Sequence, residues 1–364
     1  MACPARNAAK FASSSVSSYT DLDAKNNSYS ASGVNKLVIK RTVPKMEYIC
    51  EHNNRLYGVS NSEEEKIFNT QTGQYETVTS RVLHASALGQ PTRWNVYEGA
   101  ATDSYAVAVA GEGNFTGIVS YSGNVIAFKE DRMYKLSGDY PAEFYLRSYT
   151  VDGVKDGCHK SLAIINEVLY YLSPYGVMSY AGGVPSLISY NLDLLKFSDA
   201  VAGRDRTRYY ISMQDPKNGY MLYSYDTVRG IWVIESAEEA TGIERVGDNA
   251  YACIDGKIFK LADEAGQEVV QWEAVLPETD EGTFDSKRYE HLALIADVNG
   301  TLTIQCRTDG GEWQTIGTIT EAGKKNHRVP MDTIRCQRLQ IRLSGEGKAT
   351  IWAMERRFTV GSER

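Results

Sequence analysis

The chain has 364 residues, of which 42% are hydrophobic and 23% are charged, a balance that is typical of a folded globular protein and excludes a disordered one. Its net charge of −7 argues against a general nucleic-acid binder, whose surface must neutralise phosphates. No stretch approaches the roughly 20 apolar residues of a membrane span, so we predict no membrane segment.

The first segment, residues 1–35, is rich in Ser, Ala and Asn and contains few large apolar side chains. It lacks the apolar core of a signal peptide, and we therefore expect no export signal here. We predict an extended N-terminal arm. Two alternatives remain open: a solvated tail, or an arm that becomes ordered on a neighbouring subunit.

A hydrophobic two-strand pattern broken by a tight polar turn recurs five times after this arm. Its turns are marked by Asn54, Asn124, Glu167, Arg206 and Asn249. The last four turns lie about 40 residues apart, which matches one four-stranded propeller blade, whereas the first gap of about 70 residues indicates an insertion or a degenerate extra blade. The 24 tyrosines suit the half-buried faces of such sheets and also suit interfaces.

Each of the later hairpins is followed by an outer strand or strand pair. In the pattern YDTVRGIWVIE, Asp226 is expected to start a turn, Gly230 to take the positive-φ position and Trp232 to pack on the sheet. Residues 36–43 are a candidate for a strand that closes the ring. We therefore predict an all-β protein whose residues 36–270 form a β-propeller of about five to six blades.

Beyond residue 270 the pattern changes to simple alternation, and residues 271–364 are predicted to form a small C-terminal β-sandwich. The segment from Thr308 to Trp313 is similar to a sialidase Asp-box turn, but it occurs once and one residue short, so we interpret it as a hairpin turn. Cys306 and Cys336 are candidates to face each other in this domain, and we expect them to be reduced thiols. None of the six cysteines has the spacing of a zinc or redox motif.

Candidate chemistry is sparse along the chain. The five histidines are scattered without a metal-binding or catalytic spacing, and Gly111–Gly113 is expected to be a turn between strands. Glu51, Asp103 and Asp255 lie near predicted inner strands and are candidates for paired glycosidase acids, although turn caps or solvated loop acids are the favoured interpretation. We therefore predict no catalytic, cofactor-binding or metal-binding residues and no cofactor.

Basic residues cluster in Arg204–Arg208 and Arg335–Arg338. Either run offers guanidinium groups to DNA phosphates, but acidic residues are interleaved with arginines and no continuous basic stripe results. We favour a role at interfaces or in solubility.

Several sequence segments, in their order along the chain, resemble segments of a known group of proteins. The segment from Ala85 to Asn95 (ASALGQPTRWN), the segment from Phe115 to Gly138 and the ending from Leu343 to Arg364 are similar to β-propeller virion structural proteins of tailed bacteriophages. These include tail nozzle and tail accessory proteins, and uncharacterised structural proteins of Firmicutes phages and prophages. Compared with the longer members of this group, we expect no full domain ahead of the first blade in this sequence.

This resemblance implies a non-enzymatic virion protein, synthesised in the bacterial cytoplasm and built into the tail or neck. It implies a ring-forming, nozzle-like subunit that helps to close or line the DNA exit path. Its partners would be other copies in a homo-oligomeric ring, portal, adaptor or other tail proteins, and genomic DNA in passing contact. An alternative from another class stays open: a propeller of the tail tip that binds or cleaves host glycans.

Overall fold

The computed structural model describes residues 43–69, 71, 73–192, 196–262, 271–331 and 335–361, together with two short strands at 28–29 and 37–38. The chain divides into two compact units, Met1–Ala262 and Asp263–Arg364. Both units are built from strands, and the described residues add one short 3₁₀ helix, η1 (His159–Ser161). No helix among these residues is long and apolar enough to cross a membrane. The predicted arm at 1–35 lies outside the described residues, apart from strand β1 (Ser28–Tyr29).

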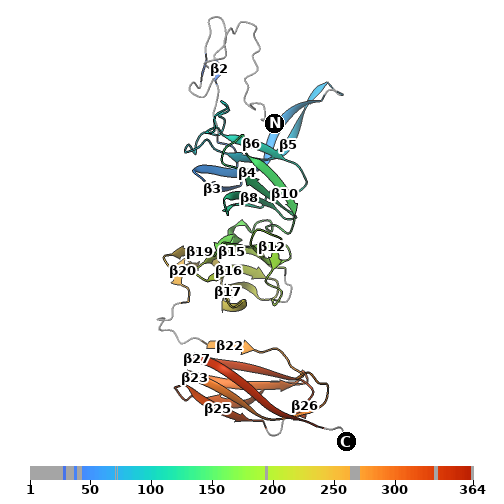
Figure 1. The fold of residues 1–364 in the computed structure, drawn as a ribbon, viewed down its shortest axis with the longest axis vertical. Helices are drawn as coiled ribbons and strands as arrows, with labels where there is room; N and C mark the ends of the chain where they lie inside the picture. Colours follow the sequence, from blue (N-terminus) through green and yellow to red (C-terminus); the bar gives the residue numbers. More distant parts are fainter. Residues whose placement is uncertain are drawn as a thin grey trace. The chain divides into compact units, whose positions relative to one another are not determined.

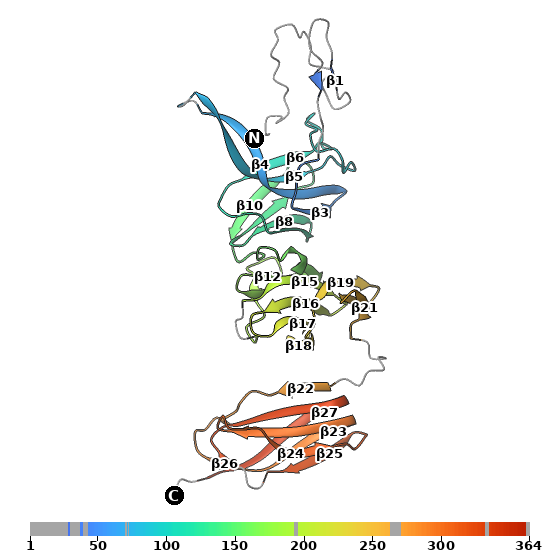
Figure 2. The same cartoon turned by 180° about the vertical axis from the view of Figure 1, so that it is seen from behind.

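From β3 onward, the described part of the first unit forms five successive antiparallel sheets, which we number as blades one to five (Figures 1 and 2). The fold is therefore all-β, with a five-bladed propeller followed by a curled C-terminal sheet. Neighbouring strands in each blade follow one another along the chain, mostly through hairpins or short loops, whereas residues 86–104 form a long loop between β5 and β6. Blades one to four have four strands each, and three strands of blade five lie among the described residues.

The strand bounds follow the predicted repeat. Blade one comprises β3 (Tyr48–His52), β4 (Arg55–Asn69), β5 (Gln74–Ala85) and β6 (Tyr105–Val109). Blade two comprises β7 (Gly117–Tyr121), β8 (Asn124–Lys129), β9 (Arg132–Ser137) and β10 (Tyr145–Thr150). Blade three comprises β11 (Ala163–Ile165), β12 (Val168–Ser173), β13 (Gly176–Tyr180) and β14 (Ser186–Leu187). Blade four comprises β15 (Ser198–Arg204), β16 (Arg208–Asp215), β17 (Gly219–Asp226) and β18 (Ile231–Ser236). Blade five comprises β19 (Ala240–Val246), β20 (Asn249–Ile254) and β21 (Lys257–Lys260).

The five recurring hairpins of the sequence are the first hairpins of the five blades, in order. The tight turns of blades one and three use residues that tolerate positive φ. Asn53 and Asn54 adopt φ of 48° and 60°, and Asn166 and Glu167 adopt 47° and 65°. A two-residue turn with both φ positive matches the twist of the flanking strands, which explains the polar residues at these turns.

Buried apolar residues join each blade to the next. One cluster lies between blades one and two, a larger one spans blades two to four, and a third joins blades four and five. Phe128 packs against Tyr171 at a ring distance of 5.2 Å, and Tyr170 stacks on Tyr209 at 5.3 Å. No apolar cluster of the described residues joins blade five to blade one.

The predicted closing strand at 36–43 is not seen in that role. Its described part, β2 (Leu37–Val38), pairs with β1 in a separate two-stranded sheet. Residues 39–42 lie outside the described residues.

The long first gap in the repeat is an insertion within blade one, and not an additional blade. Strands β4 and β5 are 15 and 12 residues long, yet β3 pairs only with Arg55–Val59 of β4, and β6 pairs only with Arg81–Ala85 of β5. The remaining parts pair with each other alone, and in Figure 1 this ribbon projects from the blade. We call it the β4–β5 arm, with Glu63–Asn69 on one strand and Gln74–Ser80 on the other.

The second unit holds one six-stranded antiparallel sheet, with β25 and β26 pairing on β23 beside the main path. Its strands are β22 (Gln271–Val275), β23 (Lys287–Thr308), β24 (Gln314–Ile319), β25 (Lys325–Pro330), β26 (Arg335–Cys336) and β27 (Leu339–Val360). Strands β23 and β27 pair along almost their whole length, and their register shifts twice. Because such bulges bend a strand, the sheet curls around its own apolar core, so the predicted sandwich is one curled sheet and not two separate ones.

Candidate functional site

The three candidate carboxylates lie in separate local turns. Glu51 accepts a hydrogen bond from the backbone N–H of Asn54 at 2.9 Å, and Asp103 accepts one from Gly99 at 2.7 Å. Asp255 is exposed at the β20–β21 turn with φ of 48°. No hydrogen bond or ion pair among the described residues joins any two of them. Glu51 and Asp103 thus cap turns and Asp255 is a solvated loop acid, the two roles that the favoured interpretation gave them.

The remaining motifs are also structural. Gly111 and Gly113 lie in the β6–β7 loop with positive φ, where the ammonium of Lys129 donates to the carbonyl oxygen of Gly111 at 3.0 Å. Thr308–Trp313 forms the β23–β24 turn, with φ of 48° at Asp309. Within the part of the chain that the structure describes, no group of three His, Cys, Asp or Glu side chains is arranged to hold a metal ion.

Cys306 and Cys336 are both buried in the core of the second unit as free thiols. Burial raises the pKa of the Cys336 thiol from its usual value to about 11, so the thiolate is disfavoured at neutral pH.

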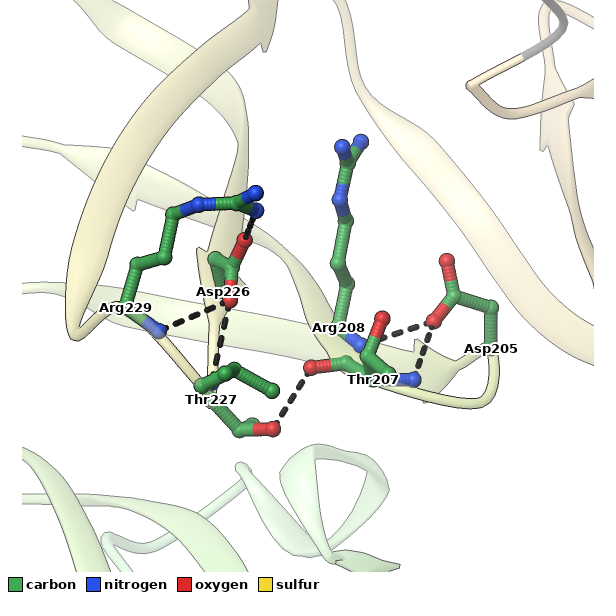
Figure 3. A network of polar contacts seen from close by, with 7 residues as sticks. Asp205, Thr207, Arg208, Asp226, Thr227 and Arg229 are labelled. Atoms are coloured by element: carbon green, nitrogen blue, oxygen red, sulfur yellow. Dashed lines mark hydrogen bonds and ion pairs between the residues drawn. The ribbon is translucent and has the colours of Figure 1, made fainter.

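The basic run Arg204–Arg208 contains the β15–β16 turn of blade four (Figure 3). The carboxylate of Asp205 accepts backbone N–H groups from Thr207 and Arg208, both at 2.7 Å. Thr227, in the neighbouring β17–β18 turn, donates its hydroxyl to the carbonyl oxygen of Thr207 at 2.6 Å. The two turns therefore support one another.

The β17–β18 turn has the predicted construction. The carbonyl oxygen of Asp226 accepts the N–H of Gly230 at 2.8 Å, and Gly230 has φ of 69°. The carboxylate of Asp226 also pairs with the guanidinium of Arg229 at 2.7 Å (Figure 3). Acidic residues are thus interleaved with arginines at this end of blade four, as expected for a turn or interface and not for a continuous DNA-binding stripe.

A buried arginine, which sequence reasoning missed, organises the loop between β5 and β6. Arg55 is 2% exposed, and its guanidinium donates to the carbonyl oxygens of Ser86 at 2.8 Å and Ala101 at 2.6 Å, and also to that of Asp103. A guanidinium offers five donors in a planar fork, which suits several converging carbonyl groups. Burial lowers the pKa of Arg55, although the group stays protonated at neutral pH.

This loop and the loop between β9 and β10 enclose a pocket of about 490 Å³. The aromatic residues that line it are Tyr97, Tyr105, Tyr140 and Phe144. Asp103 also lines it and is 5% exposed, and its Oδ1 atom is buried without a hydrogen-bond partner. Sequence analysis singled out Asp103 but gave no signal for the aromatic residues around it.

Two features of the first unit suit contacts with other chains. The outer edges of the β4–β5 arm pair with no strand among the described residues. On the blade-five face opposite the blade-four contact, Ile258 and Val246 are 76% and 64% exposed. Exposed strand edges and apolar patches are typical of interaction surfaces.

Neither a protein-family model nor a curated protein sequence matches the chain. Among solved structures, it is similar to an exo-β-1,3-galactanase from Phanerochaete chrysosporium, with a TM-score of 0.31 and 8% identity, over 84% of this chain and 95% of that one. It is also similar to a glycoside hydrolase family 43 arabinoxylan arabinofuranohydrolase from Bacillus subtilis, with a TM-score of 0.26 and 9% identity, over 88% and 96% of the two chains. Superpositions this loose carry no information about activity or substrate.

Proposed function

We propose that this protein is a non-enzymatic structural subunit of a tailed-phage virion, one that assembles into a homo-oligomeric ring in the neck or tail. The observation that carries the proposal is the β4–β5 arm. A two-stranded ribbon is at best marginally stable by itself in water, and no strand among the described residues pairs with either of its outer edges. Strand addition to a neighbouring subunit would satisfy the backbone groups of these edges and order the ribbon.

The exposed face of blade five supports the same proposal. A propeller blade buries its faces against its neighbours, and in this chain Ile258 and Val246 remain largely exposed on the last blade. Contact with a second subunit at this face would remove their apolar surface from water, at about 25 cal/mol per Å². Heterologous contacts of this kind, between an arm on one side and a face on another, generate rings when the rotation closes.

The proposed location in the neck or tail rests on the resemblance of the chain to phage propeller proteins. A nozzle-like ring would help to close or line the DNA exit path, in contact with portal, adaptor or other tail proteins. Net negative charge suits a surface that DNA passes without adhering, because like charges repel.

The experiment removes the arm at a point that the strand register defines. Glu63 pairs with Ser80, so replacing residues 64–79 by Asn-Gly closes the ribbon with a two-residue turn. We expect the parent to form an oligomer in native mass spectrometry and to be present in purified particles. The variant should keep the circular dichroism spectrum and melting temperature of the parent but lose both the oligomer and its place in particles. Thr79→Ser keeps the length and charge of the arm and serves as the control.

Two outcomes count against the proposal. If the parent chain is monomeric and absent from particles, the virion assignment is wrong. If the arm-deleted variant assembles as well as Thr79→Ser, the arm is not the assembly element.

The alternative of glycan cleavage is tested separately. Glu51, Asp103 and Asp255 are the acids that the sequence offers for it, and each lies in its own turn. Release of reducing sugar from host cell-wall glycans by the purified chain, abolished by substitution of one of these acids, would favour that alternative over a structural role.

A further inference from the structure

The pocket between the β5–β6 and β9–β10 loops is lined by four aromatic residues and by several small ones. Tyr105 and Phe144 meet edge to face with their ring centroids 5.0 Å apart. Tyr97 is 42% exposed, and the chain beside it continues through Gly99 and Ala100, whose small side chains leave room in the pocket. Its volume of about 490 Å³ falls in the range of small-molecule sites, about 300 to 1,000 Å³.

Asp103 contributes a carboxylate of which only one oxygen atom accepts hydrogen bonds from its own turn. Its Oδ2 atom accepts the backbone N–H groups of Glu98, Gly99 and Ala100. Its Oδ1 atom has no partner. Asp103 lines the pocket, and a buried carboxylate oxygen without a donor is unfavourable, so a ligand that brings a hydroxyl group to this side chain gains a strong hydrogen bond.

The β5–β6 loop, which carries Asp103, is held in place by the buried side chain of Arg55. Arg55 donates to the carbonyl oxygens of Ala101 and Asp103, and its guanidinium lies 5.9 Å from the ring centroid of Phe144. The side chain that fixes the β5–β6 loop therefore also contacts the aromatic residue contributed by the β9–β10 loop. A pocket ordered before binding loses little conformational entropy when a ligand enters it.

We propose that this pocket binds a sugar ring, with the apolar C–H face of a pyranose against the tyrosines and a sugar hydroxyl donating to Asp103. Aromatic rings cover the apolar face of such a ligand, while the carboxylate recognises its polar edge. The site would give the protein a carbohydrate-binding activity. It does not rest on the assembly role, because binding belongs to a single subunit and is measured without particles.

The test uses the full chain and four probes: the methyl glycosides of glucose, galactose, N-acetylglucosamine and rhamnose. Saturation-transfer NMR is expected to show transfer to the ring protons of at least one probe, and titration calorimetry then gives its affinity. Tyr97→Ala removes one aromatic face and is expected to weaken binding at least tenfold. Asp103→Asn keeps the size of the side chain but substitutes an amide for the carboxylate, and an equal or larger loss is expected.

Tyr175→Ala is the matched control, because Tyr175 is 67% exposed in the turn between β12 and β13 and lies outside the pocket. It should bind the probe as the parent does. The proposal is overturned if none of the four probes shows saturation transfer, or if Tyr97→Ala binds as tightly as Tyr175→Ala. Should Asp103→Asn fail to fold by circular dichroism, the comparison between the two tyrosine variants still decides the question.

Discussion

The indole nitrogen of Trp232 donates a hydrogen bond to the carbonyl oxygen of Ile188 at 2.9 Å. Trp232 belongs to the outermost strand of blade four, and Ile188 follows the last strand of blade three. The indole ring also lies against Tyr225 at 4.9 Å and Tyr223 at 6.4 Å. One side chain thus fixes the edge of its own blade and attaches it to the preceding one.

Trp232→Ala is expected to destabilise the first unit by about 2 kcal/mol, below the roughly 3 to 5 kcal/mol of a fully buried tryptophan, because the ring is only half-buried. Trp232→Phe keeps an aromatic ring but loses the N–H donor, and should cost about 1 kcal/mol. Urea unfolding followed by circular dichroism measures both values. Trp352→Ala, at a site that is 49% exposed, is the control and should change the free energy of unfolding little. An unchanged midpoint in Trp232→Ala would contradict the assigned contact.

Arg55→Met should lower the free energy of unfolding more than Trp232→Ala does. The change leaves the carbonyl oxygens of Ser86, Ala101 and Asp103 without their shared donor, and we expect a loss of about 3 to 5 kcal/mol. Hydrogen exchange should accelerate over residues 87–104 before it does in the other blades. Arg147→Met, at an exposed site on β10, is the comparison and should leave exchange unchanged. Equal exchange in the two variants would show that Arg55 does not hold the loop.

Stability should fall at alkaline pH because several tyrosines are buried in the neutral form. Burial raises the pKa of Tyr57 from its usual value near 10 to about 12, and burial also raises the pKa of Tyr209 well above that usual value. A raised folded-state pKa contributes stability that is fully present below about pH 10 and is lost as the pH rises through 12.

The expected loss is about 1.4 kcal/mol per pH unit for each tyrosine that ionises only on unfolding. Urea midpoints at pH 8, 10 and 11 measure it. Equal midpoints at pH 8 and pH 11 would contradict the prediction.

The N-terminal segment is expected to act in assembly and not in folding. Residues 1–32 offer few large apolar side chains, too few to offset the roughly 1 to 2 kcal/mol that each residue loses on backbone ordering. Deleting these residues should leave the melting transition unchanged but reduce incorporation into particles. Unfolding of the truncated monomer would instead assign the segment to the propeller core, and normal incorporation would remove its assembly role.

The blade hairpins were predictable from sequence because their signals are local. Alternating apolar residues define a half-buried strand, and two adjacent residues that tolerate positive φ, such as Asn53 and Asn54, define a tight turn. The Asp226-to-Gly230 turn is local in the same way. All of these determinants lie within a few residues of one another, so the chain order of the blades, and their number to within one, followed from the sequence.

Only the tertiary structure decided the features that depend on distant partners. Arg55 finds its acceptors 31 to 48 residues away, and no periodicity indicates that an arginine will be buried among carbonyl groups. The pairing of β23 with β27 likewise joins strands separated by a long connection, and it makes one curled sheet where alternation alone suggested a sandwich. Local sequence sets which backbone conformations are favourable, whereas the partners of a buried polar group or a sheet edge are set by the packing of the whole unit.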